Sequence, residues 1–354
     1  MSSGTTQSVR SAGALPTPAL AQRVSSPRQP ARSFSRVAGL PSSSQPPDSR
    51  RSTSTSAYAT PTPASSASAP LTRPDLSRRT ADPIPPQGSK TTKLQRLSDG
   101  LWLLQQDLWL LLDINLNTCI ARLGNGELIF ISPPARTEEA AALLAAAVAA
   151  EGLGPPAHVL VPNLSPEHWY HAADWAADCA PGAKLWVPPG LLEARSTAGL
   201  LDGQQRIRAT VDAFGGRVGV LPTRGPLPGL EGEVEVATFV EGTGSFIESA
   251  VWLARHKAVY FADLAFAAYD HPVAPNPILG AGSQITGVLG RLGCPAVYLM
   301  MLKDRAVAQA WLDTVLRWRP ERLLSGHLDP VVGSADMELR RCFGFLLEGQ
   351  QAQA

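Results

Sequence analysis

The chain has 354 residues, and its formal net charge of +1 is the sum of two regions with opposite charges. Residues 1–90 hold ten Arg and one Lys against three acidic residues, a net charge of +8, so the other 264 residues carry −7. An acidic main region disfavours a nucleic-acid partner. No apolar run approaches the ~18 residues that a membrane span needs, so no transmembrane segment is expected.

The first 90 residues differ in composition from the rest of the chain. They hold 14 of the 32 prolines, set among Ser, Thr and Ala. Such a stretch buries too little apolar surface to offset its ordering entropy, so we expect residues 1–90 to be disordered. A Ser- and Arg-rich, acid-poor start is typical of an organelle transit peptide, and its length favours a plastid (chloroplast) over a mitochondrion. The alternative is a disordered arm that stays attached and binds something acidic.

Two strand regions open the main region. Residues 101–112 are rich in Leu and Trp with a break at 105–107, and residues 118–131 alternate around Asn125-Gly126. An Asn-Gly pair between apolar runs is a hairpin signal. We therefore expect the second piece to fold back on itself.

A helix should follow, because Thr137 precedes Glu138, Glu139 and an Ala- and Leu-rich tract that reaches Ala150. Thr is a favourable N-cap, and acidic residues in the first turn interact well with the helix dipole. Composition predicts further helical segments over residues 167–180 and 303–318.

Short apolar runs predict the remaining strands. These are residues 158–161, 184–187, 234–240, 246–254, 258–262 and 322–325. Two opening strands followed by alternating helices and strands fit two sheets packed between helices. We expect one α/β domain over residues 95–345 and a flexible C-terminal tail over residues 346–354.

The cysteines are scattered along the chain and form no CxxC pair. This spacing argues against a cysteine zinc site and against a disulfide framework. We expect them to be small buried apolar residues: Cys119, Cys179, Cys294 and Cys342.

The residues that could bind a metal ion lie in three segments at the ends of predicted strands. The loop Asn163-Leu164-Ser165-Pro166-Glu167-His168 comes first, KAVYFADLAF brings Asp263, and RLLSGHLDP brings His327. In this order they resemble the metallo-β-lactamase superfamily, whose metal loop has the pattern HxHxDH. The resemblance implies an αββα sandwich with metal ligands at the sheet ends.

The resemblance also implies that one of the family's two metal sites is lost. Asn163 and Ser165 stand where the family has its first two histidines. Glu241 opens an EGTGS segment where the family has the third ligand of that site. These three residues are expected to line the cleft beside the surviving site.

The second site keeps ligand types at every position. Glu167 and His168 match the family's Asp and His, Asp263 matches its bridging Asp, and His327 lies in an SGH segment similar to the family's PGH. Carboxylate and imidazole donors bind Zn²⁺, Mn²⁺ or Fe²⁺. The four residues are therefore candidate ligands for one ion.

Two classes of function remain open at this point. A bound ion lowers the pKa of water to ~7 and provides a nucleophile at neutral pH, which would make the chain a hydrolase of an ester, thioester or phosphoester. Alternatively, hydrogen bonds from Asn163 and Ser165 satisfy the pocket without metal, and the chain is a non-catalytic homologue that binds a small molecule or a partner in the same cleft.

His171 is a further cleft candidate, because it lies three residues after His168 and would share a face of the predicted helix. A histidine in this position more often caps or packs. The pattern PN…EH…W…WVPPG, from Pro162 to Gly190, resembles the DUF4336 branch of the superfamily.

Overall fold

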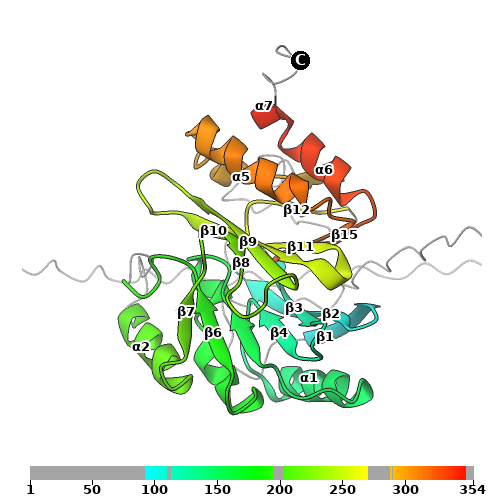
Figure 1. The fold of residues 1–354 in the computed structure, drawn as a ribbon, viewed down its shortest axis with the longest axis vertical. Helices are drawn as coiled ribbons and strands as arrows, with labels where there is room; N and C mark the ends of the chain where they lie inside the picture. The colour runs from blue at the N-terminus through cyan, green and yellow to red at the C-terminus, as the bar shows by residue number, and fades with distance from the viewer. Residues whose placement is uncertain (1–91, 110–112, 194–201, 270–287, 289, 348–354) are drawn as a thin grey trace, which may run out of the picture. The chain divides into compact units, whose positions relative to one another are not determined.

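The computed structural model describes residues 92–109, 113–193, 202–269, 288 and 290–347 (Figure 1). The segment predicted to be disordered, 1–90, lies outside these residues. Most of the predicted C-terminal tail also lies outside them, but helix α7 (Gly344–Leu347) reaches into the predicted tail and buries Leu346.

The first sheet contains seven strands that follow one another in chain order. Its strands are β1 (Thr92–Ser98), β2 (Leu101–Trp109), β3 (Asp113–Arg122), β4 (Leu128–Ile131), β5 (His158–Leu160), β6 (Lys184–Val187) and β7 (Val218–Val220). The first four strands pair antiparallel, and β4 to β7 pair parallel. The predicted hairpin turns at Gly126, whose φ of +89° favours glycine.

The second sheet has the order β15-β14-β11-β10-β9-β8. Its strands are β8 (Arg224–Pro226), β9 (Val234–Val240), β10 (Ile247–Leu253), β11 (Ala258–Phe261), β14 (Arg322–Ser325) and β15 (Val331–Val332). β11 and β14 pair parallel, and the other neighbours pair antiparallel. A separate two-stranded ladder joins β12 (Phe266–Ala267) to β13 (Leu292–Gly293).

Helices cover the outer face of each sheet (Figure 1). α1 (Glu138–Ala150) and α2 (Gly203–Ala213) pack on the first sheet. α5 (Arg305–Arg317) and α6 (Ala335–Cys342) pack on the second, together with the single-turn helix α4 (Ala296–Leu299) and α7. The predicted αββα sandwich is confirmed.

Strand β2 shows how the sequence specifies this layering. Leu101 and Leu103 belong to the core between the two sheets, whereas Trp102 and Leu104 belong to the core beneath α1. Successive side chains of a strand point to opposite faces. A run with apolar residues at every position therefore fits a strand that is covered on both sides.

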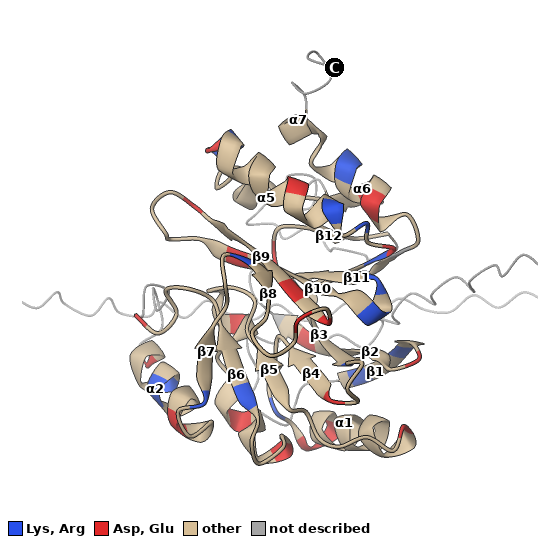
Figure 2. Ribbon diagram, viewed as in Figure 1, with Lys and Arg blue, Asp and Glu red and all other residues tan. Residues whose placement is uncertain are grey.

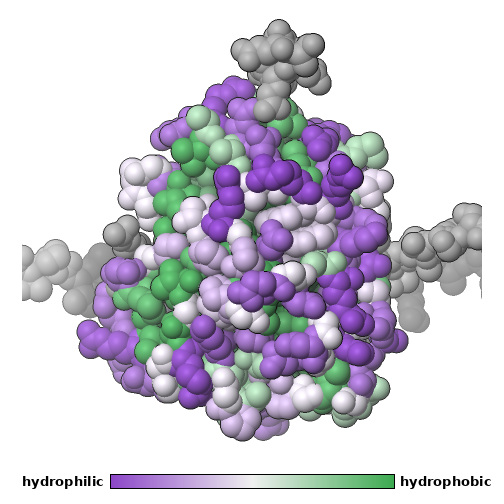
Figure 3. Space-filling model, viewed as in Figure 1, coloured by the Kyte–Doolittle hydropathy of each residue, from purple (hydrophilic) through white to green (hydrophobic). Residues whose placement is uncertain are grey.

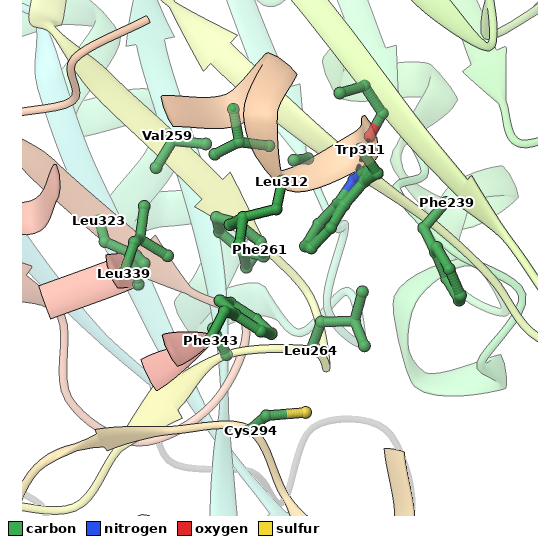
Figure 4. Close-up of a cluster of buried hydrophobic side chains, with 14 of the residues drawn as sticks. Phe239, Val259, Phe261, Leu264, Cys294, Trp311, Leu312, Leu323, Leu339 and Phe343 are labelled. Carbon is green, nitrogen blue, oxygen red and sulfur yellow. Dashed lines mark hydrogen bonds between the residues drawn. The ribbon is translucent and has the colours of Figure 1, made fainter. Parts of the chain in front are cut away.

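The outer core of the second sheet forms around Trp311 of α5 (Figure 4). Its ring meets those of Phe239, Phe261 and Phe343 edge to face, with centroid separations of 6.0, 5.7 and 5.6 Å. Its indole N–H donates to the Ala237 carbonyl at 3.0 Å. This packing fixes α5 against the sheet.

The helices also carry the charged surface. Figure 2 shows acidic and basic residues side by side on α6, where Arg340 pairs with Asp336 at 3.0 Å and Arg341 pairs with Glu338, while Leu339 faces the core. The face seen in Figure 3 mixes hydrophilic and hydrophobic residues. Within the described residues, every helix falls short of the length and apolar character that a membrane crossing requires.

The prediction of one helix over residues 167–180 is wrong. The segment forms two 3₁₀ helices instead, η1 (Pro166–His168) and η2 (Ala172–Asp178). Tertiary contacts override the local preference here: the buried indoles of Trp169 and Trp175 donate to the Leu164 and Pro134 carbonyls at 3.0 and 2.7 Å. A third 3₁₀ turn, η3 (Ala254–His256), joins β10 to β11.

Candidate metal centre

Four side chains from three distant segments meet at one edge of the sheets. Glu167 and His168 come from η1, Asp263 lies two residues beyond β11, and His327 lies two residues beyond β14. Because β11 and β14 are parallel neighbours, with Phe261 opposite Ser325, their carboxyl ends bring Asp263 and His327 together. One ligand atom from each of the four residues lies within 4.8 Å of the others.

Both histidines direct Nε2 at the same carboxylate oxygen. His327 Nε2 lies 3.1 Å from Asp263 Oδ1, and His168 Nε2 lies 3.4 Å from it. His327 Nδ1 lies 2.9 Å from the Asn115 carbonyl, which can only accept, so Nδ1 carries a proton. His168 Nδ1 contacts the Ser132 hydroxyl at 2.5 Å. Partners on Nδ1 of this kind fix the ring orientation of metal-binding histidines.

The other oxygen of Asp263 accepts hydrogen bonds from Asn163 and Ser165. Asn163 Nδ2 and the Ser165 hydroxyl each donate to Asp263 Oδ2 at 2.7 Å. Asn163 Oδ1 in turn accepts from the Ser165 backbone N–H at 3.1 Å. Asn163 is fully buried and Ser165 is half-buried, so the bond between Asn163 and Asp263 is the one protected from water.

The charges in the cluster act on one another. Burial favours protonation of Asp263, but His168 and His327 outweigh it and hold the pKa of Asp263 well below its usual range. Burial lowers the pKa of His327, but its hydrogen bond to Asp263 outweighs this and raises it. Burial and the negative charge of Asp263 raise the pKa of Glu167.

Glu248 supports the cluster from β10. It is fully buried, and its carboxylate accepts from the backbone N–H groups of Ala262, Asp263 and Leu264 at 2.8 to 3.1 Å. Burial, followed by the charge of Asp263, raises the pKa of Glu248 to about 8. The hydrogen bonds from Glu248 fix the turn that carries Asp263.

The turn that carries His327 is held by two asparagines of β3. Asn117 Nδ2 donates to the Ser325 and Leu328 carbonyls, each at 2.9 Å. Asn115 Oδ1 accepts from the Leu328 backbone N–H at 3.0 Å. These contacts join the first sheet to the loop that follows the second sheet's β14.

Several of these supporting residues escaped sequence reasoning. Two of them had a signal in the sequence: Asn115 and Asn117 alternate with the apolar Ile114 and Leu116 in β3. Glu248 also had one, as a lone carboxylate in FIESAVWL. Ser132 adopts a left-handed φ of 63°, which the sequence does not reveal.

Two predicted cleft residues make their contacts elsewhere. The hypothesis that His171 shares a helix face with His168 is wrong, because η1 ends at His168; His171 Nδ1 contacts Asp174 at 3.0 Å instead. Glu241 is half-buried, and its carboxylate accepts from Thr243 and Ser245 within its own turn.

The spacing of the donor atoms fits a shared ion. Tetrahedral ligands at ~2.0–2.2 Å from one ion lie ~3.3–3.6 Å apart, whereas a charge-assisted hydrogen bond between them would measure ~2.7–2.9 Å. The 3.4 Å from Asp263 Oδ1 to His168 Nε2 lies in the first range, whereas the 3.1 Å to His327 Nε2 is the length of an ordinary hydrogen bond. Imidazole and carboxylate donors suit Zn²⁺, Mn²⁺ or Fe²⁺.

No family model and no curated protein matches the sequence. The similar solved structures are metallo-β-lactamase fold proteins. A metallo-β-lactamase from Pontibacter korlensis aligns with a TM-score of 0.46 and 11% identity over 73% of this chain and 99% of its own. The DIM-1 metallo-β-lactamase gives 0.46 and 10% over 73% and 99%. The stereoselective inverting sec-alkylsulfatase Pisa1 from Pseudomonas sp. gives 0.43 and 16% over 72% and 41%. These likenesses concern the fold and say nothing of the substrate, metal or residue roles of this chain.

Proposed function

We propose that this chain is a single-metal hydrolase of the metallo-β-lactamase type that cleaves an ester, thioester or phosphoester. Glu167, His168, Asp263 and His327 would hold one Zn²⁺, Mn²⁺ or Fe²⁺ ion. The observation that carries the proposal is the convergence of four ligand atoms within 4.8 Å of one another, with His327 Nδ1 held by the Asn115 carbonyl and its Nε2 turned to the cluster.

The hydrogen bonds of Asp263 support one ion and not two. An Asp that bridges two ions uses one oxygen for each. Here Oδ1 faces the two histidines, while Oδ2 already accepts from Asn163 and Ser165 at 2.7 Å. A second ion would have to displace both donors, and neither Asn163 nor Ser165 offers the imidazole that the lost site needs.

When bound, a divalent ion supplies Lewis acidity, which polarises a carbonyl or phosphoryl oxygen and acidifies water at neutral pH. The chain's own residues prepare the site. Asn115 and Ser132 fix the rings of the two histidines, and Glu248 fixes the backbone on either side of Asp263. Glu167 is half-buried while the other three are buried, so we expect substrate to approach past Glu167.

The second proposal is a non-catalytic, metal-free homologue that binds a small molecule or a protein partner in the same cleft. The contacts of Asp263 favour it, because Asn163, Ser165 and a doubly protonated His327 together satisfy the carboxylate without an ion. Under either function we propose the DUF4336 branch as the chain's place in the superfamily, on the pattern from Pro162 to Gly190.

Hydrolysis by reloaded protein separates the two functions. The full chain is stripped with a chelator, reloaded with Zn²⁺, Mn²⁺ or Fe²⁺, and assayed with p-nitrophenyl acetate, an acyl thioester and bis(p-nitrophenyl) phosphate. We expect ion-dependent hydrolysis of one probe class, lost in His327→Ala and retained in the matched control His171→Ala. Protein that gains no activity with any ion, or activity unaffected by His327→Ala, would favour the non-catalytic homologue.

A further inference from the structure

A crevice of about 420 Å³ lies at the end of the sandwich opposite the candidate metal centre. The parallel strands β11 and β14 start at this end, and their other ends lead to Asp263 and His327. The first sheet contributes the end of β1 and the turn that follows it, and the second contributes the turn from β10 to β11 and the start of β14. The charged and hydroxyl side chains that line the crevice are Ser98, Asp99, Arg255, Lys257, Glu321 and Arg322.

Arg322 is a half-buried cation in this crevice whose partner is neutral. Its Nη1 donates to the Ser98 hydroxyl at 2.8 Å, which joins the second sheet to the first. Among the residues that the structure describes, no carboxylate oxygen lies within 4.0 Å of its guanidinium. A guanidinium has five N–H donors and no acceptor. Arg322 therefore has both charge and donors to offer an anion.

The two other cations of the crevice have loosely held partners. Asp99 lies 3.5 Å from Arg255 and 3.3 Å from Arg96, both longer than the ~2.7–2.9 Å of a charge-assisted hydrogen bond. Lys257 pairs with Glu321 at 2.5 Å, but 62% and 59% of these side chains are exposed. Exposed ion pairs contribute little to stability, so an anionic ligand can compete for either cation. The lining has three cations against two carboxylates, although the chain beyond its N-terminal segment carries −7 in total.

The backbone of Lys257 is a second, independent observation. Lys257 ends η3 in the left-handed region, with φ 46° and ψ 40°, where glycine or asparagine is usual. Its carbonyl accepts from the Glu321 and Arg322 backbone N–H groups at 2.9 and 3.2 Å, so the strained residue is fixed against the start of β14. Glycine would take this conformation at no steric cost. Strained residues of this kind cluster at ligand sites, which indicates that the lysine side chain has a role here.

We propose that this crevice binds a small oxyanion of the phosphate class, held by Arg322, Lys257 and Ser98. The planar guanidinium of Arg322 matches two oxygens of a phosphate, and the Lys257 ammonium adds a point charge. The Ser98 hydroxyl accepts from Arg322, so its own proton is available to the ligand. A volume of about 420 Å³ falls in the range of small-molecule sites. The site lies at the other end of the sandwich from Asp263 and His327 and does not depend on a metal ion.

The test is calorimetric titration of the full chain with inorganic phosphate and with a sugar phosphate, in chelator so that no metal ion can bind the anion. Arg322→Gln removes the charge and keeps a donor for the Ser98 hydroxyl. Lys257→Gly removes the charge and relieves the left-handed backbone, so the fold is retained. The matched control is Arg340→Gln, which removes an equal charge from an exposed pair with Asp336 on α6. His327→Ala reports on binding at the metal centre.

We expect one phosphate per chain, bound about tenfold more weakly by Arg322→Gln and by Lys257→Gly, with a Tm in Lys257→Gly no lower than in wild type. Arg340→Gln and His327→Ala should bind as wild type does. Tighter binding of the sugar phosphate would identify an ester as the ligand, and tighter binding of inorganic phosphate would identify the free anion. Wild type that binds neither, or equal affinity in wild type, Arg322→Gln and Lys257→Gly, would overturn the proposal. Binding lost in His327→Ala and kept in Arg322→Gln would also overturn it, by placing the anion at the metal centre.

Discussion

Gly326 provides a sensitive test of the cluster's geometry, because there is no room for a side chain between Ser325 and His327. A Cβ built on Gly326 would lie 2.6 Å from the Ala262 carbonyl oxygen and 2.8 Å from His168 Cε1. The backbone is fixed on both sides of this contact: the Gly326 N–H donates to the Phe261 carbonyl, and the Gly326 carbonyl accepts from Asn117, each at 2.7 Å.

Gly326→Ala must therefore shift either the backbone next to Asp263 or the ring of His168. Added atoms in a well-packed core cost about 1–3 kcal/mol, and each kcal/mol lowers the Tm of a domain of this size by about 2–4 °C. A displaced His168 ring would also move Nε2 away from its 3.4 Å position beside Asp263. We expect Gly326→Ala to have a lower Tm than wild type and to bind the metal ion more weakly.

Thermal unfolding and metal titration of the full chain provide the assay. Gly182→Ala is the matched control, because a Cβ at Gly182 meets no atom within 4 Å. It should leave both the Tm and the metal affinity unchanged. If Gly326→Ala also matched wild type in both measurements, the close approach of the His327 loop to His168 would be wrong, and the site would not have the described geometry.

Three further predictions concern other parts of the chain. Thr137→Ala removes the N-cap bond to the Ala140 N–H at 3.0 Å and should lower the free energy of unfolding by about 1 kcal/mol; an unchanged urea midpoint would contradict this. Burial lowers the pKa of His256, whose Nε2 donates to the Arg122 carbonyl at 2.8 Å. The unfolded chain therefore binds this proton more readily than the folded one, so stability is fully present above about pH 6.5 and decreases as the pH falls toward the folded pKa. His256→Gln keeps a donor and should reduce that decrease in urea unfolding, and an equal decrease would count against the assignment. Finally, residues 1–90 fused to a fluorescent reporter should enter plastids and be shortened, whereas a diffuse full-length signal would support a retained arm.

The two sheets could be predicted from local pattern because most strands are short apolar runs between polar turns. Strand β1 could not, since the sequence TKLQRLS alternates weakly and depends on pairing with β2. The segment 167–180 has helical composition, yet the burial of Trp169 and Trp175 selects 3₁₀ turns instead. Tertiary contacts outweigh propensity in such short stretches.

The candidate ligands could be predicted from sequence through the resemblance of their segments to a known metal motif, and the parallel pairing of β11 and β14 explains why Asp263 and His327 lie together. The residues that support them could not be placed in the same way. Glu248 acts on backbone N–H groups 14 to 16 residues away, and Asn115 and Asn117 of the first sheet hold the loop that carries His327. Only the assembled fold determines these distances. His171 was predicted to share a helix face with His168. That prediction failed because the segment is not one α-helix: η1 ends at His168 and η2 begins after His171.

Metal content is the most direct measurement of whether these four side chains form a metal site. The full chain, purified without chelator and incubated with Zn²⁺, Mn²⁺ or Fe²⁺, is washed free of unbound ion and analysed for bound metal per chain. We predict one ion per chain in wild type and in His171→Ala, most of it lost in His168→Ala and His327→Ala, because loss of one ligand removes much of the coordination energy. Wild-type protein without stoichiometric Zn, Mn or Fe, and without a thermal shift on adding these ions, would contradict the metal site and leave the metal-free binding protein as the better description.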